Sequence, residues 1–282
     1  MKRLKAYLLL MRLHRPVPIL LLLWPTYWSL FYVSKGFPSI KLFIIFTLGV
    51  IIMRTCGCII NDISDRDFDK NVKRTEMRPL TTGEIRLKSA WILFIILSLI
   101  AFVLVLFLNW ISIIFSFGAI VLTVIYPLCK RFFALPQLVL GAAFNYGILM
   151  ASTAVIIKIP PSVWLLYFAA IIWTLAYDTI YALADKPYDI KLGLKSSAVT
   201  FGSYDLTMIL TLQQITLGLI LLFGGLNHYN FWFYLTLIIA EFLFIRQYKL
   251  YKKRQINSCI KAFSDNHWVG FFIFLGIVIQ YL

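Results

Sequence analysis

Nine long apolar runs constrain this chain more than any other feature of its sequence. Each run is about 17–22 residues long, the length of helix that crosses the hydrocarbon core of a bilayer. The runs occupy residues 17–34, 40–60, 89–107, 110–126, 136–157, 162–181, 206–225, 230–246 and 267–282. A soluble domain is about 45–50% apolar, whereas this chain is 61% hydrophobic. The pattern predicts one all-α domain over residues 1–282, a polytopic membrane protein with about nine transmembrane helices.

The basic residues are distributed unevenly between the loops that join these runs. The net charge is +15, which in a soluble protein would favour a nucleic-acid partner. With a cytoplasmic N-terminus, however, the external loops contain only Lys35, Lys41 and Lys158 of the 27 Lys and Arg residues. This asymmetry follows the positive-inside rule, so no nucleic-acid partner is needed to explain the charge. We therefore expect an integral protein of a bacterial inner membrane, with its N-terminus on the cytoplasmic side.

Two acidic stretches, residues 61–69 and 178–189, hold seven of the 12 carboxylates. Carboxylates beside hydrocarbon are costly, so such clusters are functional by default. In the first stretch, positions 61, 65 and 69 share one face of a continuing helix, whereas Asp67 lies off it and suits a solvated helix end. Hard oxygen ligands of this kind suit Mg²⁺, which also binds substrate phosphates. The candidate metal ligands are Asn61, Asp62, Asp65, Asp69, Asp178, Asp185 and Asp189.

Several cations lie near these acidic stretches and are candidates for binding an anionic substrate. Arg54 lies inside an apolar run, where a guanidinium needs a carboxylate or an anionic substrate as its partner. Arg74 and Arg78 follow the first acidic stretch, and Arg forks match phosphate oxygens well. Two cations end the fourth run, where they also satisfy the positive-inside rule, and Arg12 and Arg15 are either anion ligands or membrane-flanking cations. The candidate substrate-binding residues are Arg54, Arg74, Arg78, Lys130 and Arg131.

The acidic stretches resemble the paired Asp-rich motifs of the UbiA superfamily of intramembrane aromatic prenyltransferases. The first motif, Asn-Asp-x-x-Asp-x-x-x-Asp, stands at residues 61–69, and the second, Asp-x-x-Tyr-Ala-x-x-Asp-x-x-x-Asp, at 178–189. A likeness to members that prenylate 4-hydroxybenzoate for ubiquinone synthesis covers almost the whole chain. It rests on residues 11–12, 21–26, 54–58, 74–75, 78–80, 126–127, 130–131, 136–137 and 141. Residues 14–16 (His-Arg-Pro) depart from it, because an acidic residue and a lysine are expected before that proline.

The resemblance implies a central cavity among nine helices, with the active site near the cytoplasmic face. It implies Mg²⁺-dependent transfer of a polyprenyl group from polyprenyl diphosphate to the carbon ortho to the hydroxyl of 4-hydroxybenzoate. The motif residues would hold the magnesium diphosphate, the cations would contact phosphate or shield the site, and Arg54 would orient the aromatic acid or the first motif. Tyrosines would sit beside the allylic cation, and either a carboxylate, with Asp185 preferred, or the pyrophosphate would remove the ring proton. The residues so implied to act in catalysis are Asp65, Asp185, Tyr126 and Tyr181.

Two other interpretations of the sequence stay open. Within the family, the acceptor is alternatively a naphthoate, a homogentisate-like phenol or a porphyrin. From a different class, a membrane ion or solute transporter also carries polar residues within apolar helices. Transporters usually place those residues near the bilayer midplane, whereas these clusters lie at one end of the apolar runs. The pattern favours the enzyme.

Overall fold

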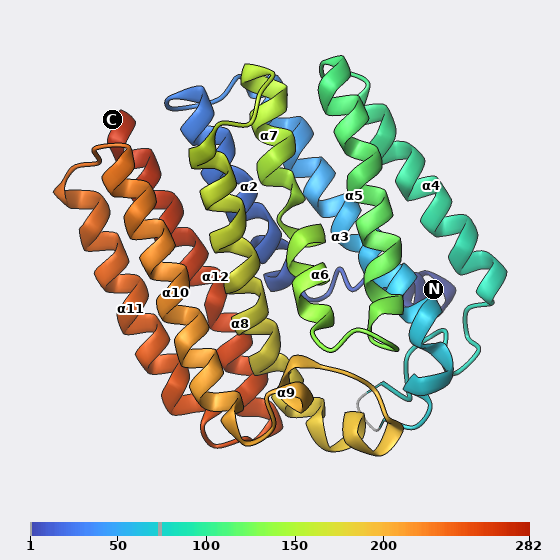
Figure 1. The fold of residues 1–282 in the computed structure, drawn as a ribbon. Coiled ribbons are helices and arrows are strands. Elements are labelled where there is room, and N and C mark those ends of the chain that lie inside the picture. The colour runs from blue at the N-terminus through green and yellow to red at the C-terminus, as the bar shows by residue number, and fades with distance from the viewer. Residues whose placement is uncertain (1, 73–74) are drawn as a thin grey trace.

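The structure, a computed structural model, describes residues 2–72 and 75–282 and is built from helices (Figure 1). In chain order these are α1 (Lys2–Leu10), α2 (Val17–Ser34), α3 (Ile40–Asp69), α4 (Leu87–Val105), α5 (Trp110–Cys129), α6 (Pro136–Phe144), α7 (Tyr146–Ile156), α8 (Pro161–Leu192), α9 (Ser197–Thr200), η1 (Gly202–Tyr204), α10 (Asp205–Leu226), α11 (Phe231–Tyr251), α12 (Ile256–Val278) and η2 (Ile279–Tyr281). Within the described residues, nine spans are long and apolar enough to cross a membrane, with α6 and α7 forming one of them. The predicted all-α class and the nine spans are confirmed.

Three spanning helices, α3, α8 and α12, extend furthest beyond the apolar runs that predict them. α3 continues to Asp69 and α8 to Leu192, so both acidic stretches are helical and form the ends of membrane spans. α12 begins at Ile256 instead of 267 because polar residues interrupt its hydropathy without interrupting the helix. One of these, Asn266, is buried and accepts a hydrogen bond from the Trp173 indole at 3.0 Å. Hydropathy therefore underestimates helix length where a polar side chain is satisfied inside the protein.

The central core forms where α8 packs against α2 and α12. Trp28 and Trp173 are fully buried there, with ring centroids 5.5 Å apart. The Trp28 indole donates to the carbonyl of Gly270 at 2.9 Å, which satisfies its polar atom inside the core. By contrast, α4 and α5 expose apolar side chains on their outer faces, as helices that contact lipid do. α8 is thus held on several sides, which fixes the acidic stretch at its end.

The fifth span is broken at Asn145, which separates α6 from α7. The Asn145 side-chain amide donates to the carbonyls of Gly141 at 2.8 Å and Ala170 at 3.1 Å, and to the Thr174 hydroxyl at 2.8 Å. These bonds compensate for part of the backbone hydrogen bonding that is lost at the break, because polar groups within a membrane span need partners inside the protein. A Cβ on Gly141 would lie 3.0 Å from the carbonyl oxygen of Ile171, so glycine permits this close approach of α6 to α8.

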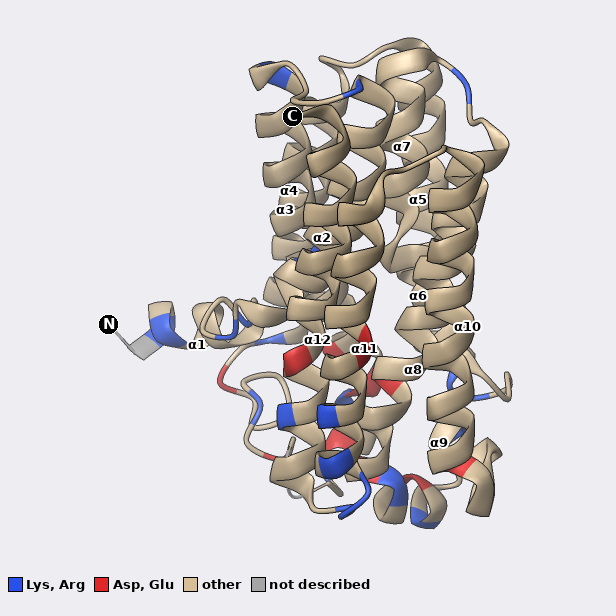
Figure 2. Cartoon of the chain, turned by 90° about the vertical axis from the view of Figure 1, so that its left-hand side faces the viewer, with Lys and Arg blue, Asp and Glu red and all other residues tan. Residues whose placement is uncertain are grey.

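Charged residues gather at one end of the bundle, the end at which α3 and α8 finish, here called the charged end (Figure 2). The opposite end carries few Lys or Arg residues and the C-terminus. Near the charged end, α1 lies across the direction of the spanning helices (Figure 2). Ala6 and Leu10 of α1 are buried against Ile59 and Ile60 of α3. The N-terminal helix is therefore attached to the helix that carries the first acidic motif.

Candidate active site

One cavity of about 1210 Å³ brings most of the predicted site residues together at the charged end. α3, α5, α8 and α12 all contribute to its wall. The predicted residues that line it are Arg54, Asn61, Asp62, Asp65, Asp69, Arg78, Tyr126, Lys130, Asp178, Tyr181, Asp185 and Asp189. Both acidic motifs thus face one space. Arg131 is not among the lining residues, and Arg74 lies outside the described residues.

The inner part of the cavity is apolar. It extends from the charged end between α2, α3, α5 and α7. Its lining there includes Phe46, Leu108, Phe117, Tyr146 and Met150. A cavity with carboxylates and cations at one end and hydrocarbon at the other suits an amphiphilic molecule with an anionic head and a long apolar tail.

Two arginines hold the first motif on the side of α3 that faces the N-terminal turn. Arg78 donates to Asp62 at 3.0 Å and to Asp69 at 2.6 Å. Arg12 donates to the same oxygen of Asp62 at 2.5 Å. Asp62 is only 2% exposed, and a carboxylate buried to that degree needs such partners. Burial works against the charged form of Arg12, but the attraction of Asp62, Cys58 and Tyr181, together with the hydrogen bond to Asp62, raises the pKa of the Arg12 guanidinium.

Lys130 holds the other face of the first motif. Its ammonium donates to Asn61 at 2.9 Å and to Asp65 at 2.6 Å, and lies 5.6 Å from the centre of the Tyr126 ring. Burial disfavours the charge, yet the attraction of Asp65 and Tyr126, together with the hydrogen bond to Asp65, holds the pKa of Lys130 above its ordinary value. Lys130 follows the last residue of α5, so one cation joins α5 to the acidic end of α3. Asp67, in contrast, pairs with Lys70 at the exposed surface, as its position off the motif face predicts.

The second motif faces the cavity from α8. Asp178, Tyr181, Asp185 and Asp189 all line the space, as the helical spacing predicts. Asp178 is hydrogen-bonded by Gln137, a residue of α6 whose carbonyl oxygen also accepts from the Ser197 backbone at 2.9 Å. The Tyr181 ring packs at a tilt against Phe263 of α12, with centroids 5.0 Å apart.

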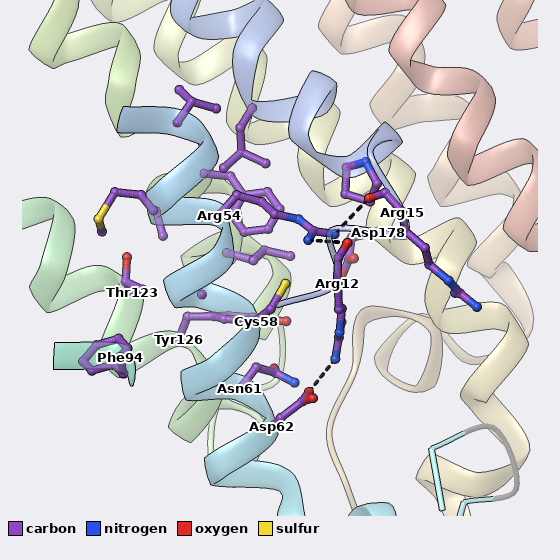
Figure 3. Close-up of a pocket in the computed structure, with 18 of the residues that line it drawn as sticks. Arg12, Arg15, Arg54, Cys58, Asn61, Asp62, Phe94, Thr123, Tyr126 and Asp178 are labelled. Carbon is purple, nitrogen blue, oxygen red and sulfur yellow. Dashed lines mark hydrogen bonds and ion pairs between the residues drawn. The ribbon is translucent and has the colours of Figure 1, made fainter. Parts of the chain in front are cut away.

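Arg54 binds the N-terminal turn, and the contact is relevant to the second of the two roles that the resemblance implied, orienting the aromatic acid or the first motif. Its guanidinium donates to the carbonyls of Arg12 at 3.2 Å and Arg15 at 3.4 Å (Figure 3), and also to the carbonyl of Met11 at 3.1 Å. Figure 3 also shows the Arg12 guanidinium reaching from this turn to Asp62. Arg54 therefore acts on the first motif through the turn that presents Arg12, while its side chain still lines the cavity.

Arg131 occupies a different environment from the one predicted for it. Its guanidinium donates to the carbonyl of Ser64 at 3.1 Å and lies 5.8 Å from the centre of the Phe68 ring. It is exposed and packs on the outer surface of α3. Its neighbour Lys130 lines the cavity, so these two cations lie in different environments although they are adjacent in the sequence.

The oxygen donors in the cavity fit Mg²⁺ shared with a phosphate group. Among the residues that the structure describes, no three Asp, Glu, His or Cys side chains converge closely enough to bind a metal on their own. Mg²⁺ is usually held by one or two protein carboxylates together with substrate phosphates, so a divided set of ligands is suitable. Asn61 and Asp65 on α3 and Asp178, Asp185 and Asp189 on α8 provide oxygen donors from both sides of one space.

Two residues with contacts in the site were not singled out for it by the sequence. Arg12 was an open choice between an anion ligand and a flanking cation, and the structure pairs it with Asp62. Gln137 was noticed only as part of a family likeness, but it is buried and links Asp178 to the start of α9. A buried amide near the beginning of an apolar helix was the one signal that could have indicated it.

The comparisons with known proteins agree with this geometry. The UbiA prenyltransferase family matches residues 22–276. A 4-hydroxybenzoate octaprenyltransferase of Francisella tularensis subsp. novicida (strain U112) is 54% identical over 281 residues, covering 100% of this chain and 99% of the relative. The apo structure of a UbiA homolog from Aeropyrum pernix K1 has a TM-score of 0.81 at 23% identity, covering 94% of this chain and 99% of that chain. A UbiA homolog from Archaeoglobus fulgidus bound to GPP and Mg²⁺ has a TM-score of 0.67 at 21% identity, covering 97% and 99%.

Membrane-spanning helices around a cavity with acids and cations at one end define an intramembrane enzyme. The family match extends over most of the chain, and the Francisella relative aligns over its full length. The chain belongs to the UbiA prenyltransferase family.

Proposed function

We propose that this enzyme transfers a polyprenyl group from polyprenyl diphosphate to 4-hydroxybenzoate, at the ring carbon ortho to the hydroxyl, with Mg²⁺ as cofactor. The reaction is a step of ubiquinone biosynthesis. The observation that carries the proposal is a single cavity whose charged end suits a metal diphosphate and whose inner part suits a prenyl tail. The acceptor is supported by the name of the 54% identical relative. The metal is supported by the Archaeoglobus homolog bound to GPP and Mg²⁺.

The diphosphate would bind between α3 and α8. Asn61 and Asp65, with the three aspartates of the second motif, would hold Mg²⁺, which when bound neutralises charge on the departing diphosphate. Asp62 and Asp69 would join them as Arg78 turns from these carboxylates to the phosphate oxygens. Lys130 is charged and lies beside the same space, so it would donate to the diphosphate as well. Arg74 would add a further phosphate contact.

The first chemical step would break the carbon–oxygen bond of the donor, and the electron pair would leave with the diphosphate. The allylic cation that forms would lie near the ring faces of Tyr126 and Tyr181, which attract a cation electrostatically. Donors positioned for the leaving group in such a site typically contribute about 10²–10³ in rate each.

In the second step the ring carbon ortho to the hydroxyl would attack the allylic cation and form the new carbon–carbon bond. A carboxylate would then take the ring proton, which restores aromaticity and balances the reaction. Asp185 is our candidate for this base because it faces the cavity from α8. Arg54 would support the acceptor side of the site through the N-terminal turn.

We further propose that the charged end faces the cytoplasm. The three external lysines that the sequence predicts, Lys35, Lys41 and Lys158, belong to the segments at the other end, and most remaining cations gather at the charged end (Figure 2). This distribution follows the positive-inside rule.

The test is product analysis by mass spectrometry. Membranes containing the enzyme are incubated with Mg²⁺, 4-hydroxybenzoate and prenyl diphosphates of several lengths, and in parallel with a naphthoate, homogentisate or a porphyrin. We expect ring-prenylated 4-hydroxybenzoate, and its loss in Asp65→Ala and Asp185→Ala variants that still insert and fold. Full activity in either variant would remove the site assignment. Prenylation of another acceptor alone would replace the substrate, and solute uptake without any product would favour a transporter.

A further inference from the structure

A buried carboxylate outside the cavity ties together three segments at the charged end. Asp205, the first residue of α10, is 0% exposed and does not line the cavity. Arg254, between α11 and α12, donates to both of its oxygens, at 2.6 and 2.8 Å. Lys186 of α8 donates to it at 2.6 Å. We call Asp205, Lys186 and Arg254 the Asp205 network.

Burying such charges has a cost. Replacing a buried ion pair by apolar residues is often neutral or stabilising, so an ion network alone is weak support for a stability role. In some proteins, buried ionic groups instead fix the register of the elements that they join.

Lys186 directly follows Asp185 of the second motif, and it is this lysine that the network holds. One residue corresponds to about 100° of helix rotation, so Lys186 lies a quarter-turn from the face that carries Asp185 and Asp189. Lys186 is held at a second point, because it also donates to the carbonyl of Gly202 at 2.6 Å. Gly202 has φ +57, a conformation that favours glycine, so this carbonyl belongs to a turn of defined shape.

The helix is weakened at the same place. Pro187 lies inside α8, between Asp185 and Asp189, two of the three α8 carboxylates that line the cavity. Proline has no N–H, so the helical bond to the carbonyl of Leu183 is missing. The last turns of α8 are therefore less strongly tied to the rest of the helix. A contact on Lys186 acts next to this weak point.

We infer that Asp205, through Lys186 and with Arg254, sets the rotation of the end of α8 and so aims Asp185 and Asp189 into the cavity. Asp205 is thus a positioning residue for the second motif and touches no substrate. The inference rests on the proposed function, because it concerns how these carboxylates meet a magnesium diphosphate. Partners that orient metal ligands in this indirect way typically contribute about 10–100-fold to metal affinity.

The variant that tests this is Lys186→Met, because it removes the ammonium and leaves Asp205 paired with Arg254. We expect the Kd of geranyl diphosphate in the presence of Mg²⁺, measured by calorimetry on the purified full chain, to rise about tenfold or more. The Mg²⁺ concentration for half-maximal activity should rise in parallel, while the KM for 4-hydroxybenzoate changes by less than about twofold. Lys186→Arg keeps the charge and should recover most of the affinity.

The matched control is Arg246→Met, which breaks the Arg246–Asp265 pair (3.0 Å) between α11 and α12 at residues that do not line the cavity. It should leave the Kd unchanged. Asp205→Asn tests whether Asp205 acts on the second motif through Lys186. If it does, the Asp205→Asn, Lys186→Met double variant should bind the diphosphate no more weakly than the worse single variant, because both substitutions break the same Asp205–Lys186 contact. Independent, multiplied losses in the double variant would overturn the inference.

A Lys186→Met enzyme that melts earlier yet binds magnesium geranyl diphosphate like the wild type would also overturn it, since the network would then serve the fold alone. The binding assay needs no acceptor. A wild-type enzyme that binds the diphosphate but does not prenylate 4-hydroxybenzoate would therefore refute the proposed function, while the effect of Lys186→Met on binding would still decide the inference.

Discussion

Replacing Lys130 by methionine should lower both the stability and the activity of this enzyme, by amounts that the structure allows us to work out. The Lys130 ammonium donates to Asn61 at 2.9 Å and to Asp65 at 2.6 Å. Removing one partner of a fully buried pair costs about 3–5 kcal/mol, whereas an exposed pair contributes about 0–1 kcal/mol. Here the side chains are 24% and 15% exposed. We therefore expect a loss of about 1–2 kcal/mol, which lies between these limits.

The sign of the pH dependence follows from the raised pKa of Lys130. A lysine with a raised pKa contributes stability that is fully present below its unfolded pKa of about 10.4. That contribution disappears only as pH rises through the still higher pKa of the folded protein. The difference in stability between wild type and Lys130→Met should thus stay constant from about pH 6 to pH 9.

The effect on catalysis should be larger than the effect on folding. If Lys130 donates to the departing diphosphate, its loss should lower kcat by about 10²–10³. The assays are thermal unfolding in detergent and initial rates with geranyl diphosphate and 4-hydroxybenzoate. Lys252→Met is the matched control, since Lys252 also lies 5.6 Å from the centre of a tyrosine ring, that of Tyr248, but lines no part of the cavity. Wild-type kcat in Lys130→Met would refute the reasoning.

Three further predictions follow from the same site. Arg78→Met removes the Arg78–Asp69 ion pair and one of the two arginine pairs of Asp62, so the melting temperature and kcat should both fall; unchanged melting would mean that these ion pairs contribute nothing. A Cβ at Gly118 would lie 2.3 Å from the Tyr146 hydroxyl, so Gly118→Ala should push that ring into the apolar part of the cavity. The variant should then lose rate with octaprenyl diphosphate more than with geranyl diphosphate, and equal losses would contradict this. Chelation by EDTA should abolish product formation and added Mg²⁺ restore it, whereas activity that survives chelation would exclude the metal role.

Most of the fold could be predicted from the sequence because the apolar runs carry its dominant physical constraint. In a bilayer, backbone polar groups need partners within the protein, which leaves long helices as the solution for such runs. The errors occur where tertiary contacts satisfy polar residues, as at the start of α12, where Asn266 is bonded to Trp173. The break at Asn145 was missed for the same reason, since its partners on α8 are distant in sequence.

The candidate site was predicted unevenly. Helical spacing correctly placed both acidic motifs on faces that meet one cavity, because spacing along a helix is a local property. The positions of the cationic side chains were harder to predict, because a long flexible side chain can point in several directions. Lys130 points into the cavity, whereas Arg131 lies outside it. Arg54 was predicted to be functional, and its partners are backbone carbonyls of a turn some forty residues away, which no local pattern indicates.

The attachment of the N-terminal turn to the first motif has a practical consequence for handling the enzyme. Arg12 is bonded to Asp62, and α1 extends from that turn along the charged end (Figure 2). An affinity tag fused before α1 could therefore displace Arg12 from Asp62, a carboxylate that lines the cavity. The C-terminus lies at the other end of the bundle (Figure 2). Purification handles and fluorescent reporters are therefore better placed at the C-terminal end of α12, far from the Arg12–Asp62 contact.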